Sequence, residues 1–138
     1  MIRIERPVGL NHLVSTLSEG SSMPPVYWRS WVEQVSKGQS AALLDETGAV
    51  LAVAGLYPKT DDVDLLWFCA TPRARSRMVA ICRLFRLTLL EACESRKVTV
   101  RAFVAKGWRP TMRFLALLDF RHCGEVAGFD VWDKSFGG

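Results

Sequence analysis

The sequence predicts one α/β (α+β) domain over residues 1–138, with a mixed, mostly antiparallel sheet of about six or seven strands and about four flanking helices. Three strand-like runs, 40–44, 49–57 and 63–70, follow one another across short gaps, which predicts an antiparallel meander. The wide apolar stripe over 73–95 predicts a helix buried against a sheet. Alternating residues over 98–104 then predict a strand parallel to 63–70, reached by a right-handed crossover.

The remaining elements complete the order βααβββαβαβ(β). The N-terminal residues predict a first strand, with Ile2 and Ile4 on one face. Gly55 interrupts the middle strand of the meander, which predicts a bulge or a close approach of another group to the backbone. Helical spacing, proline and glycine signals predict helices over 8–20, 24–38 and 110–118, and one or two strands over 120–132.

Composition excludes several classes of protein. With 138 residues, of which 49% are hydrophobic, the chain can bury one core, and disorder is not expected. No apolar run reaches the roughly 18 residues that a membrane span needs, and the N-terminus lacks the apolar stretch of a secretory signal, so we expect an intracellular, cytoplasmic protein. The four cysteines show no C-x-x-C spacing and only two histidines are present, so we assign neither a metal nor a disulfide.

Charge is distributed unevenly along the chain. The net charge is +4, yet residues 73–113 hold eleven basic and two acidic residues, which leaves seven basic and twelve acidic residues elsewhere. A basic segment in an otherwise acidic chain predicts an anionic ligand. Nucleic acid, a phosphorylated cofactor and an acidic protein surface all satisfy this pattern, although no nucleic-acid-binding module is present.

Two segments carry a family pattern. In the first, Phe68 to Ala80, a strand is followed by a proline, an arginine and a helix start. This segment resembles the cofactor signature P-x-x-R-G-x-G-I-G/A of the GNAT superfamily of N-acetyltransferases. The residues on the pattern are Pro72, Arg75, Val79 and Ala80, while Ser76 and Met78 occupy the preceding glycine positions.

The second segment, Trp108 to Phe120, resembles the N-x-x-A-x-x-F-Y-x-x-L-G-F segment of the same superfamily. Its matching residues are Phe114, Leu118 and Phe120; Trp108 stands for the asparagine, Leu115 for the tyrosine and Asp119 for the glycine. More narrowly, the chain resembles GNAT-like proteins of short-tailed bacteriophages, one branch of which is counted among internal virion proteins.

The resemblance implies a site for acetyl-CoA or CoA where the third meander strand gives way to the long helix. Backbone groups there would bind the pantetheine arm, and helix-start amides would bind the pyrophosphate, as anions are bound at helix N-termini. Three arginines, at 73, 75 and 77, add charge for phosphate. The implied cofactor-binding residues are Cys69, Ala70 and Thr71 for the arm and Arg75, Ser76, Arg77, Met78, Val79 and Ala80 for the pyrophosphate.

Catalytic residues are not identified. Leu115 occupies the position of the tyrosine that protonates the leaving thiolate in many GNAT enzymes, and it cannot donate a proton. Candidate bases, each with an ordinary structural explanation, are Asp61, Asp62, Asp64, His12 and His122. Three functions therefore stay open: an acyl-CoA-dependent N-acyltransferase for an unidentified amine, an inactive GNAT-shaped virion or interaction protein, and, least favoured, a nucleic-acid binder. Exposed edge strands also permit an oligomer.

Overall fold

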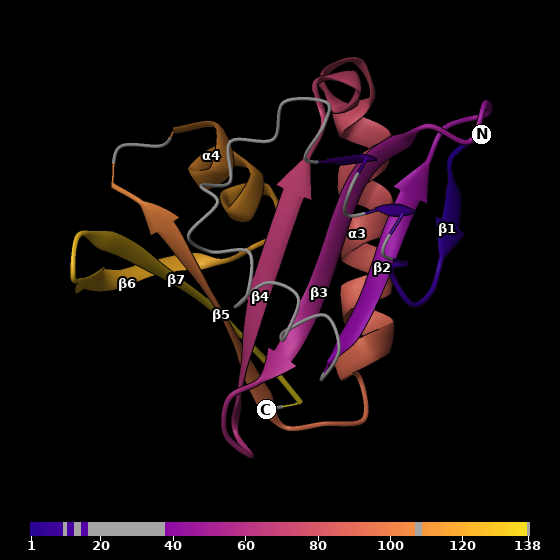
Figure 1. Ribbon diagram of the computed structural model, residues 1–138. Helices are drawn as coiled ribbons and strands as arrows, with labels where there is room; N and C mark the ends of the chain where they lie inside the picture. Colours follow the sequence, from indigo (N-terminus) through magenta and orange to yellow (C-terminus); the bar gives the residue numbers. More distant parts are fainter. Residues whose placement is uncertain (10, 13–14, 17–37, 107–108, 138) are drawn as a thin grey trace. The chain divides into compact units, whose positions relative to one another are not determined.

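The computed structural model describes residues 1–9, 11–12, 15–16, 38–106 and 109–137 (Figure 1). The helices of this part are a 3₁₀ helix, η2 (Pro72–Arg77), and two α-helices, α3 (Met78–Cys93) and α4 (Arg109–Leu117). The strands are β1 (Arg3–Glu5), β2 (Gln39–Leu44), β3 (Val50–Pro58), β4 (Val63–Ala70), β5 (Val98–Ala105), β6 (Arg121–Val126) and β7 (Phe129–Phe136).

The strands form one seven-stranded mixed sheet with the order β1-β2-β3-β4-β5-β7-β6. β2 is antiparallel to β1 and β3, and β7 is antiparallel to β5 and β6. Val63–Leu65 of β4 pairs in parallel with Thr99–Arg101 of β5. This parallel pair confirms the strand–helix–strand connection that the sequence predicted. By contacts, the chain divides into two compact units, residues 1–57 with 67–81 and residues 58–66 with 82–138.

The helix predictions need two corrections. The predicted single helix over 73–95 is a 3₁₀ helix followed by α3, which ends at Cys93. Pro72 stands at the start of η2, where its missing amide hydrogen is tolerated, and a 3₁₀ turn commonly begins an α-helix. The predicted count of about four helices is also not reproduced, because the described residues hold two α-helices and η2. The predicted helices 8–20 and 24–38 lie largely outside the described residues, although residues 11–12 and 15–16 are helical.

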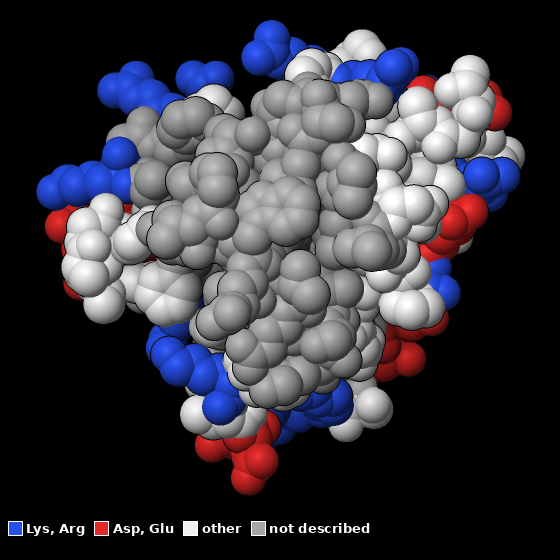
Figure 2. Space-filling model, viewed as in Figure 1, with Lys and Arg blue, Asp and Glu red and all other residues white. Residues whose placement is uncertain are grey.

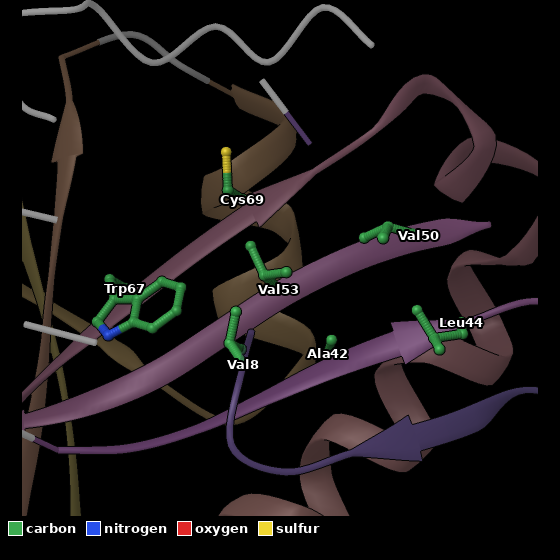
Figure 3. Packing of buried hydrophobic residues seen from close by; sticks show 7 residues of the cluster. All are labelled: Val8, Ala42, Leu44, Val50, Val53, Trp67 and Cys69. Atoms are coloured by element: carbon green, nitrogen blue, oxygen red, sulfur yellow. The ribbon is translucent and has the colours of Figure 1, made fainter. Parts of the chain in front are cut away.

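The first unit is organised around β1, β2 and β3, which lie side by side in Figure 1. Figure 3 shows side chains from β2, β3 and β4 gathered on one face of these strands. Trp67 and Cys69 share that face because residues two apart on a strand point the same way. The cluster consists of Val8, Ala42, Leu44, Val50, Val53, Trp67 and Cys69, all buried.

Gly55 is the point of closest packing in this cluster. A Cβ atom on Gly55 would lie 2.5 Å from Cε2 and Cζ2 of the Trp67 indole ring. Real Cβ atoms do not approach other atoms so closely, so only glycine lets the ring lie against β3. The predicted close approach to the backbone at Gly55 is therefore confirmed, and the approaching group is Trp67.

The second unit contains the ladder of β5, β7 and β6 together with most of α3 and all of α4. Phe85 of α3 and Phe114 of α4 pack edge to face, with ring centroids 5.4 Å apart. Arg101 of β5 lies opposite Asp133 of β7 and donates to both of its carboxylate oxygens, at 2.9 and 3.0 Å. Within the described residues, no helix is long and apolar enough to cross a membrane.

The end of α4 is closed by a Schellman motif. The amide of Phe120 donates to the carbonyl of Leu115 at 3.0 Å, and the amide of Asp119 donates to that of Ala116 at 3.0 Å. Leu115 and Phe120, buried at 2% and 3% exposure, supply the apolar residues that accompany such a cap. The motif requires a left-handed residue, and Asp119 has φ 68°. The glycine that the family pattern places here is the residue that adopts this conformation most easily.

We expect Asp119→Gly to raise the free energy of unfolding by about 0.5–1 kcal/mol, because glycine relieves the left-handed strain at a helix end. The ion pair that would be lost, Lys134 Nζ to Asp119 Oδ2 at 3.9 Å, is long, and its carboxylate is exposed, so it contributes little. Urea unfolding measures the change. The matched control is Asp119→Ala, which keeps a Cβ and should lower stability, so an equal effect of both substitutions would contradict the assignment of strain.

Candidate functional site

The candidate site is the turn from β4 into η2, within the first unit. Thr71 is 3% exposed and fixes this turn to β3. Its amide donates to the carbonyl of Leu51 at 2.9 Å, and its hydroxyl donates to the carbonyls of Val50 at 2.8 Å and Leu51 at 3.2 Å. Its own carbonyl accepts from the amide of Ala74. The hydroxyl of Thr71 is thus committed to β3, and no side chain caps η2.

Cys69 and Ala70 lie at the end of β4, beyond the Val63–Leu65 ladder with β5. Cys69 is buried in the cluster of Figure 3, and Ala70 is half-buried. Burial raises the pKa of two other thiols, Cys82 and Cys93, while the side chain of Cys123 is exposed. Because the side chain of Cys69 belongs to the core, its backbone is the part that could bind a ligand.

The short helix η2 is strongly basic. Its first turn contains no acidic residue, and Arg73, Arg75 and Ser76 are exposed. Figure 2 shows Lys and Arg side chains at the top of the view, where η2 lies in Figure 1. No contact of Arg75 with an acidic side chain is found within the described residues. Cations just before a helix are unfavourable against the helix dipole. An anion bound there would be stabilised by the cations and by the dipole together.

Arg77 differs from its two neighbours because it is already neutralised. Its guanidinium donates to Glu46, with Nη1–Oε2 at 3.2 Å and Nη2–Oε1 at 3.1 Å. The N-terminal amine of Met1 and then Arg77 lower the pKa of Glu46 to about 2. This acidic partner, 31 residues away in sequence, could not be found from the local pattern. It makes Arg77 a residue that attaches η2 to the β2–β3 turn.

The positive charge of the arginines and the small side chain of Ser76 favour a pyrophosphate at this turn. Ser76 is small and exposed at the first glycine position, whereas Met78 at the second is half-buried. Val79 is 71% exposed and Ala80 is half-buried. In a 3₁₀ helix, amides donate to carbonyls three residues earlier, so η2 itself uses amides that the sequence assigned to phosphate. The exposed arginines and the Ser76 hydroxyl are therefore the main hydrogen-bond donors available to a bound anion.

The basic segment 73–113 is less cationic than its residue count implies. Four of its eleven basic residues form ion pairs with acids outside the segment. Those pairs are Arg77–Glu46, Arg96–Asp64, Arg101–Asp133 and Lys106–Glu125. Among the described residues of η2, Arg77 is thus paired with an acid, whereas Arg75 has no acidic side chain in contact.

Most of the candidate bases have structural partners. Asp64 is 2% exposed and accepts both ends of the Arg96 guanidinium, at 2.9 and 3.1 Å. This pair raises the pKa of Arg96 and makes Asp64 a buried anchor rather than a base. Asp62 and Asp61 are exposed in the β3–β4 turn, where the Thr60 hydroxyl accepts from the amide of Asp62 at 3.3 Å.

The two histidines are also held by neighbours. Nδ1 of His12 accepts from the amide of Gly9 at 3.0 Å, and Nε2 lies 3.0 Å from Oε2 of Glu5. His122 Nε2 lies 2.9 Å from Oδ1 of Asp130. Leu115 is buried among core residues, and Trp108 lies outside the described residues. The described residues thus form a basic turn at the candidate site, and none of the five candidate bases lies in that turn.

No protein-family model matches the sequence, and no curated protein matches it. Solved structures do match its fold. A GNAT superfamily phosphinothricin acetyltransferase from Sinorhizobium meliloti, in complex with AcCoA, is 15% identical with a TM-score of 0.74, covering 99% of this chain and 89% of that one. Campylobacter jejuni N-acetyltransferase PseH, in complex with acetyl coenzyme A, is 13% identical with a TM-score of 0.67, covering 98% and 99%.

An N-acetyltransferase from Staphylococcus aureus Mu50 is 15% identical with a TM-score of 0.69, covering 98% of each chain. These similarities extend over nearly the whole of both chains, so the chain has the fold of the GNAT acetyltransferases. The fold agrees with the resemblance inferred from the two sequence segments. At such low identity it establishes the architecture, while the assignments of Cys69–Thr71 and Arg75–Ala80 to a cofactor stay predictions.

Proposed function

We propose that the chain binds acetyl-CoA or CoA at the turn from β4 into η2 and acts as an acyl-CoA-dependent N-acyltransferase on an amine. The observation that carries the proposal is the exposed Arg75 in the last turn of η2, shortly before α3, on a fold shared with solved structures that contain acetyl-CoA. Arginine binds phosphate through two parallel hydrogen bonds, and the start of α3, three residues after Arg75, adds a favourable dipole.

The residues of the turn have separate tasks in this proposal. Thr71 holds the end of β4 to β3, so the backbone of Cys69 and Ala70 is presented in a fixed position. Arg77, clamped by Glu46, fixes the direction of η2. Arg75 and Ser76 then bind the pyrophosphate. The bound cofactor would supply an activated acyl thioester, and the chain's part is to bind and orient it.

We expect wild-type protein to bind acetyl-CoA with a Kd on the order of micromolar, and Arg75→Glu to raise that Kd more than about tenfold, because it replaces a charge-assisted hydrogen bond with repulsion. Isothermal titration calorimetry measures both. Arg121→Glu is the matched control, since Arg121 is an exposed arginine on the edge strand β6. Absence of binding at about 1 mM CoA, or equal loss in both variants, would overturn the proposal.

A second candidate, a GNAT-shaped protein without turnover, is favoured by Leu115. This residue is 2% exposed and has no ionisable group at the position of the family's tyrosine. Such a protein would keep the anion site and serve as a virion or interaction component, as in the phage branch that the sequence resembles. Thiol release from acetyl-CoA, measured with a panel of amines, separates the two: binding without release supports the second candidate, and release that Arg75→Glu removes supports the first.

A further inference from the structure

The exposed face of α3 carries basic residues in its first half and acidic residues, at matching distances from the centre, in its second half. Two basic residues precede two leucines, and two acidic residues follow them, in the pattern R-x-x-R-L-x-x-L-E-x-x-E. Residues three and four apart lie on one side of a helix, so all six side chains share one stripe. They are Arg83, Arg86, Leu87, Leu90, Glu91 and Glu94, and each is exposed.

The centre of this stripe is apolar. Leu87 is 63% exposed and Leu90 is 50% exposed, although both are large aliphatic side chains. Leu117, at the end of α4, is 61% exposed, and its carbonyl accepts a hydrogen bond from Arg86. Three exposed leucines thus come from neighbouring parts of the second unit. Grouped exposed apolar side chains rimmed by charges are typical of protein interfaces.

The charges on this stripe are unfavourable for the isolated helix. Arg83 and Arg86 are three residues apart, as are Glu91 and Glu94, and like charges at that spacing destabilise a helix. Glu91 lies in the last turn of α3 and Glu94 directly follows it, where the helix dipole favours cations instead. No acidic residue lies three or four positions from Arg83. A positive charge supplied from outside would stabilise Glu94 at the helix end, and a negative charge would relieve the repulsion between Arg83 and Arg86.

We propose that α3 packs antiparallel against α3 of a second copy of this chain, about a two-fold axis between Leu87 and Leu90. In this antiparallel arrangement, a residue before the axis lies at the same height as the partner's residue that follows the axis by an equal number of positions. Leu87 then contacts the partner's Leu90, and Arg83, near the centre line of the stripe, faces the partner's Glu94. Two-fold symmetry makes every one of these contacts twice, as in an isologous interface.

The contact is specific in direction. A parallel arrangement would set Arg83 against the partner's Arg83 and Glu94 against the partner's Glu94, so repulsion excludes it. One helix face, widened by Leu117, is smaller than the roughly 800 Å² per partner of a standard interface. We therefore expect a dimer that forms with a Kd in the range of about ten micromolar and dissociates on dilution.

Sedimentation velocity over a concentration series tests the dimer, with circular dichroism confirming that each variant is folded. Arg83→Glu and Glu94→Arg each place like charges opposite one another twice, so each should weaken self-association by about tenfold or more. The two variants mixed together should associate again, because every facing pair is then opposite in charge. The double variant Arg83→Glu/Glu94→Arg should also regain self-association, which general surface effects cannot produce.

Leu87→Asp is the packing test and should abolish association. Arg121→Glu on β6 is the matched control, since it reverses an exposed arginine elsewhere and should leave the dimer unchanged. A wild-type protein that stays monomeric at about 200 μM would overturn the proposal. So would a dimer that resists both single reversals, because another surface, such as the edge strand β6, would then form it.

Discussion

Arg96→Met is expected to lower the free energy of unfolding by about 3 kcal/mol, because it leaves the carboxylate of Asp64 buried without a counter-charge. Asp64 is 2% exposed, and Arg96 supplies hydrogen bonds to both of its oxygens, at 2.9 and 3.1 Å. Methionine keeps the aliphatic length of the arginine, so the lost packing is small. Urea unfolding at neutral pH, followed by circular dichroism, measures the difference.

The matched control for this prediction is Arg101→Met. Arg101 binds Asp133 in the same bidentate geometry, at 2.9 and 3.0 Å, but the side chain of Asp133 is 17% exposed, against 3% for Asp64. Water can hydrate the orphaned Asp133, so we expect a loss of only about 1 kcal/mol. The double variant Asp64→Leu/Arg96→Met should recover part of the loss, since no buried charge remains. Equal losses in the two single variants would show that burial of the carboxylate is not the cause.

The elements that follow strong local patterns were predicted well from the sequence. β4 was predicted at its observed bounds, and β2, β3, β5 and α4 within one or two residues at each end. The parallel β4–β5 pair followed from the length of the connection between them. These predictions succeed because side-chain periodicity and short turn-forming gaps are properties of neighbouring residues.

Pairings between residues far apart in the chain could not be predicted from the sequence. Asp64 was a candidate base because it lies on the strand that leads to the cofactor turn, and nothing local links it to its partner Arg96, 32 residues away. Arg77 was assigned to the pyrophosphate by the family resemblance, and its ion pair with Glu46, which lies on another turn, had no local signal. The division of 73–95 into η2 and α3 was also missed, because apolar spacing does not distinguish a 3₁₀ start from an α-helix. In each case tertiary contacts decide the role of the residue.

The same distinction explains the outcome at the family's glycine positions. Asp119 could be tested from the backbone alone, and its φ of 68° shows that the conformation of the motif is kept without its glycine. The position of the turn from strand to helix was predictable from the sequence, because the end of the strand alternation and Pro72 are local signals.

Gly55→Ala is expected to destabilise the first unit by about 3 kcal/mol, because the added methyl group would meet the Trp67 ring. The new Cβ would lie 2.5 Å from two ring carbons and 2.6 Å from Nε1. The ring cannot move away cheaply, since Trp67 is only 9% exposed and packs in the cluster with Val53 and Cys69. Thermal and urea unfolding measure the loss.

A double-mutant cycle identifies Trp67 as the cause of that loss. Trp67→Leu alone should cost a few kcal/mol through lost packing. In its background Gly55→Ala should cost less than about 1 kcal/mol, because the shorter side chain leaves room for the methyl group and alanine is less flexible than glycine in the unfolded chain. If Gly55→Ala costs the same with and without the indole ring, the requirement for glycine instead lies in the backbone of β3, and the close approach of Trp67 does not set it.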